Sequence, residues 1–102
     1  MKTIFDLLNI SWVCDSGHSW LKVPMNRIKS LGIADKISSY SYMHGSYAYL
    51  EEDCDADIYL TAELGQDWQR NPGMKYQISN IPTRIYKNDA PCRGYASYGV
   101  KS

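Results

Sequence analysis

The sequence predicts one α+β domain over residues 1–102, with a mostly antiparallel sheet and about two helices packed on one face. Two segments carry apolar side chains at helical spacing, and several short segments rich in β-forming residues come in pairs joined by turns. A length of 102 residues and an apolar fraction of 44% suit a single globular core. The expected order of elements is β-β-α-β-β-α-β-β.

The first elements are short. Residues 3–9 fit either a short helix or an edge strand, and periodicity leaves both open. Residues 11–14 and 19–23 are predicted strands, because they are rich in apolar and aromatic side chains and flank the turn formers of residues 15–18, DSGH. We therefore expect an antiparallel pair here.

A helix is expected to begin at Pro24, whose missing N–H costs nothing in the first turn of a helix. Gly32 is expected to end it, with Ile33 packing back on Ile28, as a left-handed helix stop prefers. The apolar stripe of this helix is Met25, Ile28 and Leu31.

Residues 40–49, YSYMHGSYAY, predict a β-hairpin. His44 and Gly45 are the expected turn, since Gly45 can adopt the positive φ that such turns need. In this register the first tyrosine lies opposite the last, the second lies opposite the third, and all four share one face. The four are Tyr40, Tyr42, Tyr47 and Tyr49. Two interpretations stay open: the rings pack beneath the helices as core, or they form an exposed binding platform.

A second helix is predicted after the acidic run of residues 51–57, EEDCDAD, where Asp53 or Asp55 can cap the first backbone donors. Gly65 is expected to end it. Its apolar side chains, at four-residue spacing, are Ala56, Leu60 and Leu64.

The C-terminal third is expected to add strands. Residues 66–73 read as a loop that holds Trp68, and residues 75–79 and 83–87 as two strands. Residues 92–100, rich in Gly and Tyr, are predicted to form a last edge strand.

The charge and the composition of the chain argue against some classes of function. Eleven basic residues balance eleven acidic ones, which argues against a protein whose main task is to grip nucleic-acid phosphates. No Lys or Arg occurs from residue 37 to 69, so the surface is expected to be acidic in the middle of the chain and basic at both flanks. Nine Tyr and three Trp against one Phe favour half-buried or interface positions for the rings.

Cysteine usage and the absence of a secretory signal or membrane-spanning segment predict a cytoplasmic protein with free thiols. Zinc is a weak alternative, because Cys14 and His18 bracket one turn while Cys54 and Cys92 stand alone. A catalytic Cys-His pair would have to combine Cys14 or Cys54 with His18 or His44. No local sequence signature supports such a pair. The acidic run lacks the glycine and distal glutamate of a calcium loop. We therefore expect no metal, no cofactor and no enzyme activity.

Three stretches carry a resemblance: residues 17–24 (GHSWLKVP), 31–38 (LGIADKIS) and 47–55 (YAYLEEDCD), together with 90–95 (APCRGY). The chain resembles small, largely uncharacterised proteins encoded by bacteriophages and other mobile elements, most closely over about residues 12–64. The resemblance implies a bacterial cytoplasm and an accessory role. Small phage proteins of this size often bind and block a host protein, including CRISPR effectors and restriction enzymes.

The expected function is stoichiometric binding of a host protein, as an anti-defence inhibitor of the anti-CRISPR or anti-restriction kind. Such a surface could occupy a basic channel that normally holds nucleic acid. The rivals are a nucleic-acid-binding accessory protein that uses the flanking cations, and a small Cys/His enzyme. The expected aromatic anchors are Tyr40, Tyr42, Tyr47 and Tyr49, and the expected charged rim is Glu51, Glu52 and Asp53.

Overall fold

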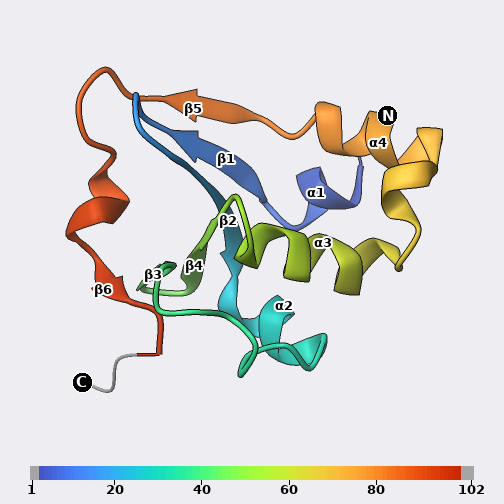
Figure 1. Cartoon of the computed structure of the whole chain (residues 1–102), viewed down its shortest axis with the longest axis horizontal. Coiled ribbons are helices and arrows are strands. Elements are labelled where there is room, and N and C mark those ends of the chain that lie inside the picture. Colours follow the sequence, from blue (N-terminus) through green and yellow to red (C-terminus); the bar gives the residue numbers. More distant parts are fainter. Residues whose placement is uncertain (1–2, 100–102) are drawn as a thin grey trace.

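A computed structural model describes residues 3–99 as a six-stranded sheet in the order β5-β1-β2-β4-β3-β6, with helices on one face (Figure 1). The strands are β1 (Ser11–Cys14), β2 (Ser19–Pro24), β3 (Tyr42–His44), β4 (Tyr47–Glu51), β5 (Thr83–Ile85) and β6 (Ala96–Ser97). The helices are α1 (Ile4–Leu7), α2 (Met25–Ser30), α3 (Asp55–Leu64) and α4 (Pro72–Ser79), with the 3-10 turns η1 (Trp68–Arg70) and η2 (Pro91–Gly94). The α+β class and the mostly antiparallel sheet are confirmed, and the pairing of β1 with β5 is parallel.

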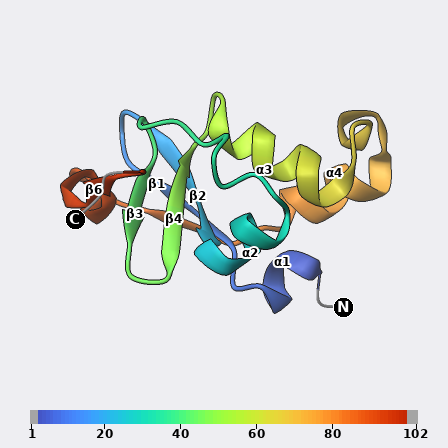
Figure 2. The same ribbon diagram turned by 90° about the horizontal axis from the view of Figure 1, so that it is seen from below.

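The two faces of the sheet have different covers. The helices cover the face that carries Leu21, Val23 and Leu50, all fully buried. The opposite face is covered in part by residues 86–95, which we call the strap and which include η2 (Figure 2). A second, smaller apolar cluster lies between this face and the strap: Val13, Trp20, Tyr49, Ala90 and Cys92. None of the described helices is long and apolar enough to cross a bilayer.

The first two helices have the termini that their sequences encode. Within residues 3–9, Ile4–Leu7 form helix α1, where Thr3 and Asp6 make a reciprocal capping box. Gly32, with φ of 72°, follows α2, and the N–H of Ile33 donates to the carbonyl of Ile28 across a Schellman stop. Pro24 is the last residue of β2 and lies just before α2, so its predicted place in the first turn is wrong by one position.

The tyrosine hairpin forms with a shifted register. Gly45 and Ser46 are the turn, and Gly45 has φ of 59° at the first central position, where a type II′ turn needs glycine. Tyr42 therefore pairs with Tyr49 and not with Tyr47. Tyr40 lies before β3, so its predicted pairing with Tyr49 is wrong.

The predicted strand at residues 75–79 is wrong, since this segment belongs to helix α4. The side chain of Asn71 accepts from the backbone N–H groups of Gly73 and Met74, and Pro72 occupies the first turn. This start signal outweighs the β-forming side chains that follow. Helices α3 and α4 form a long connection from β4 to β5, and such a crossover lets two strands run in the same direction. Because β4 and β1 are both antiparallel to β2, β5 then runs parallel to β1.

The acidic run does not cap α3 as predicted. Asp55 is fully buried and turned toward the loop before β3, where it accepts from the backbone N–H of Ser38 and from the hydroxyls of Ser38 and Ser41. Glu51 accepts from the backbone of Asp53 and Cys54 in the turn before the helix. Of the edge strand predicted over residues 92–100, Ala96–Ser97 form β6, residues 92–94 belong to η2, and residue 100 lies outside the described residues.

Candidate functional site

The candidate site is a pocket of about 530 Å³ at one end of the sheet, which we call the aromatic–acidic pocket. It forms where the β1–β2 turn, the loop before β3, the β4–α3 turn and η2 converge. Its lining residues are His18, Trp20, Ser38, Tyr40, Tyr42, Glu51, Asp53, Cys54 and Arg93. Its volume lies within the range of about 300–1,000 Å³ that is typical of ligand pockets.

Aromatic rings form the apolar wall of this pocket. Trp20 is 2% exposed, and the centroid of its ring lies 6.1 Å from that of Tyr42 and 6.0 Å from that of His18. Tyr40 stands at the rim with 79% of its surface exposed. A tyrosine so exposed next to a pocket is typical of binding surfaces, because its ring adds contact area at a low entropic cost.

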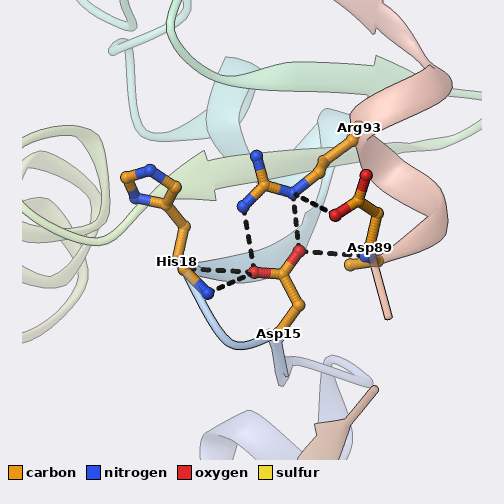
Figure 3. Close-up of polar contacts among 6 residues, drawn as sticks. Asp15, His18, Asp89 and Arg93 are labelled. Carbon is orange, nitrogen blue, oxygen red and sulfur yellow. Dashed lines mark hydrogen bonds and ion pairs between the residues drawn. The ribbon is translucent and has the colours of Figure 1, made fainter. Parts of the chain in front are cut away.

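A partly buried ion pair holds the strap against this end of the sheet (Figure 3). The carboxylate of Asp15 accepts from Nε of Arg93 at 2.6 Å, from the backbone N–H of Ala90 at 2.9 Å, and from the backbone N–H groups of Gly17 and His18. The side chain of Asp15 is only 2% exposed. Its contacts with the strap join segments more than seventy residues apart in the chain.

These contacts fix the charge state of the pair. The hydrogen bonds from Arg93, and then from Ala90, hold the pKa of Asp15 far below its usual range. The same carboxylate raises the pKa of Arg93. The guanidinium of Arg93 lies 5.0 Å from the ring centroid of Trp20, so this cation is engaged from two sides within the protein.

The remaining charge in the pocket is negative. Glu51 pairs with Trp20 across β4 and β2, so their side chains share a face. Asp53 follows in the exposed turn. Within residues 3–99, neither carboxylate forms an ion pair. The pocket therefore combines an aromatic wall with unneutralised carboxylates, and this combination favours a positively charged ligand group.

The predicted site residues are only partly brought together. Tyr40, Tyr42, Glu51 and Asp53 line the pocket. Tyr47 lies on the same sheet face outside it, with the ammonium group of Lys22 at 4.3 Å from its ring centroid, and Glu52 is exposed nearby in the turn.

Tyr49 is a correction to the predicted anchors. It is 8% exposed and packs in the cluster beneath the strap, so it has no accessible ring to offer a partner. The hairpin face is thus neither core beneath the helices nor a fully open platform, because the strap covers part of it. The covering strap could not be read from the local hairpin pattern.

The cysteines and histidines are dispersed, apart from one pair. His18 and Cys54 line the same pocket, although no hydrogen bond joins their side chains. His44 stacks on Tyr95, with ring centroids 4.2 Å apart. Cys92 belongs to the strap and is buried against the sheet, and burial raises the pKa of its thiol to about 11. Residues 3–99 contain no group of three or more His, Cys, Asp or Glu side chains placed to hold a metal ion.

Sequence reasoning missed four residues that build the site: Asp15, Trp20, Ser38 and Arg93. Asp15 was recognisable as a turn former, and its two backbone contacts with Gly17 and His18 are of that local kind. Its contacts with the strap depend on the tertiary fold and leave no signal in the local sequence.

The chain matches no protein-family profile, no curated protein and no solved structure.

Proposed function

We propose that this protein binds a protein partner stoichiometrically and blocks it, using the aromatic–acidic pocket to receive a positively charged side chain. The observation that carries the proposal is the coincidence of an apolar aromatic wall with carboxylates that pair with no cation among the described residues. Glu51 and Asp53 would pair with the incoming Lys or Arg, and its alkyl stem would lie along Trp20 and Tyr42. Tyr40 would pack against the partner outside the pocket.

A basic partner surface fits the charge pattern better than nucleic acid does. Lys and Arg are absent from residue 37 to 69, the segment that supplies most of the pocket. The remaining cation, Arg93, is already paired with Asp15. Nucleic-acid phosphates would therefore meet net negative charge at this site. A protein channel lined with Lys and Arg would meet the same negative charge and would be attracted by it.

The resemblance to small bacteriophage and mobile-element proteins supplies the biological context of the proposal. A partner with a basic channel in a bacterial cytoplasm suggests a nucleic-acid-handling effector. We propose an anti-defence role on this basis, of the anti-CRISPR or anti-restriction kind.

Capture from bacterial lysate tests the partner class. The tagged protein is immobilised and exposed to lysate with and without nuclease treatment, and bound proteins are quantified. We expect one protein in equimolar amount that nuclease does not remove. Recovery that disappears with nuclease would contradict the proposal and would indicate the nucleic-acid rival.

A small Cys/His enzyme is the second candidate, because His18 and Cys54 line one pocket and Cys54 is exposed. A nucleophilic thiolate would react with iodoacetamide near neutral pH much faster than an ordinary thiol. Equal, slow labelling of Cys54 in the native protein and of a cysteine in a short peptide would exclude this candidate.

A further inference from the structure

A second, smaller pocket lies between the sheet and the strap, on the same face as the aromatic–acidic pocket. Its volume is about 170 Å³. That is below the range of about 300–1,000 Å³ for pockets that take drug-sized ligands, so only a small group fits. We call it the strap pocket, and its polar lining is Ser11, Lys22, Tyr49, Arg84, Tyr86 and Tyr95.

The two cations of this pocket come from different strands. Lys22 is on β2 and Arg84 is on β5, with β1 between them. Within residues 3–99, neither forms an ion pair with a carboxylate, and no Asp or Glu lines the pocket. Both instead lie over aromatic rings, Lys22 at 4.3 Å from the centroid of Tyr47 and Arg84 at 5.2 Å from that of Tyr86. An aromatic face attracts a cation without neutralising it, so both charges remain for an anion.

The tyrosines add hydrogen-bond donors. The ring of Tyr49 lies 5.2 Å from that of Tyr95, centroid to centroid, and Tyr49 is 8% exposed. Burial, with smaller contributions from Tyr95 and Cys92, raises the pKa of Tyr49 to about 12. Its hydroxyl is therefore protonated at neutral pH and able to donate. A small pocket with hydroxyl donors and two cations that no carboxylate of residues 3–99 neutralises has the chemistry of an oxyanion site.

We propose that the strap pocket binds a phosphate group, either as inorganic phosphate or as the end of a small phosphate monoester. Lys22 and Arg84 would hold its charge, and Tyr49 and Ser11 would donate to its oxygens. A nucleic-acid backbone is disfavoured because it needs an open groove along several nucleotides, whereas this pocket is small and partly roofed by the strap.

The test is an NMR titration of the ¹⁵N-labelled full chain at constant ionic strength, with chloride as the background anion. Inorganic phosphate, methyl phosphate and a single-stranded oligonucleotide without terminal phosphate are added separately. We expect saturable shifts at the backbone amides of Ser11, Lys22, Arg84 and Tyr95 with the first two probes. Saturation by both shows a site for the phosphate group itself, and saturation by one alone identifies whether the free ion or the monoester is preferred.

Variants separate this site from general attraction to a cationic surface. The double variant K22M/R84M should weaken phosphate binding at least about tenfold, which is the effect of losing two charge-assisted contacts. The matched control K29M/R70M removes one exposed Lys and one exposed Arg elsewhere and should bind as the wild type does. The single variant R84M removes an exposed side chain and should itself weaken binding, which keeps the test valid if the double variant unfolds.

Two results would overturn the proposal. One is the absence of saturable shifts with both phosphate probes, or shifts that K22M/R84M and R84M leave unchanged. The other is saturation by the oligonucleotide alone, which would assign the pocket to a phosphodiester backbone. Neither result bears on the aromatic–acidic pocket, whose partner binding is measured separately.

Discussion

At the scale of single residues, Asp15 and Asp55 show how carboxylates that look like turn and cap residues hold separate segments together. Asp15 fastens the strap to the β1–β2 turn, and Asp55 fastens the loop before β3 to helix α3. Both side chains are buried and fully hydrogen-bonded. The sequence placed both residues correctly in turns or helix starts. It could not indicate their partners, because Ser38, Ser41 and Arg93 approach only in the folded chain.

The depressed pKa of Asp15 predicts a specific dependence of stability on pH. The folded chain keeps this carboxylate ionised below its ordinary pKa of 3.8, whereas the unfolded chain takes up a proton there. The stabilisation from Asp15 is therefore present above about pH 4 and declines as the pH falls below it. In D15N we expect lower stability at pH 7 and a smaller further loss between about pH 4 and pH 2.

Urea unfolding across this pH range measures the effect. Glu63, whose burial is outweighed by hydrogen bonds from Arg27 and Tyr59, also has a lowered pKa, so D15N should retain part of the acid dependence. The exposed Asp57 supplies the control, and D57N should lose stability toward acid as steeply as the wild type. An unchanged pH dependence in D15N would contradict the role assigned to the Asp15–Arg93 pair.

At the scale of elements, local stop and start signals explain most successes and failures of the sequence-based predictions. The Schellman stop of α2 was predictable because Gly32 and the packing of Ile33 on Ile28 are encoded within six residues. Helix α4 was missed, although Asn71 and Pro72 form a recognisable start, because the segment after them also fits a strand. The hairpin register was missed by one position because both His44-Gly45 and Gly45-Ser46 offer a glycine for the turn.

The stop of α2 gives a quantitative prediction. G32A places a side chain at φ of 72°, which should cost about 1–2 kcal/mol in the free energy of unfolding. Gly94 has open space around it and no positive φ, so G94A should be neutral or slightly stabilising. Thermal or urea denaturation of the two variants measures the difference. Equal stability of G32A and G94A would show that the chain ends α2 without a left-handed residue.

At the scale of the whole molecule, the strap explains how one sheet face carries both a core and a candidate site. It buries Tyr49 over the middle of the sheet and leaves Trp20, Tyr42 and Glu51 in the pocket at its end. The sequence predicted four of the pocket residues from the tyrosine-rich and acidic segments. It could not predict the strap, since a turn near residue 15 and a 3-10 turn near residue 93 meet only through the tertiary fold.

Partner binding through the aromatic–acidic pocket predicts a contrast between two matched variants. Y40A/D53N removes one exposed ring and one exposed carboxylate at the pocket, both outside the apolar core. Y76A/D67N removes an exposed tyrosine and an exposed aspartate from α4 and the preceding loop. The two changes are alike in chemistry and differ in place, so a difference in affinity reports on the pocket itself.

The most direct measurement is the dissociation constant of the captured partner for the wild type and both variants, by titration calorimetry after nuclease treatment. We expect one-to-one binding that Y40A/D53N weakens at least about tenfold and Y76A/D67N leaves within about twofold. Unchanged affinity in Y40A/D53N, or equal losses in both variants, would contradict the claim that this pocket is the binding site.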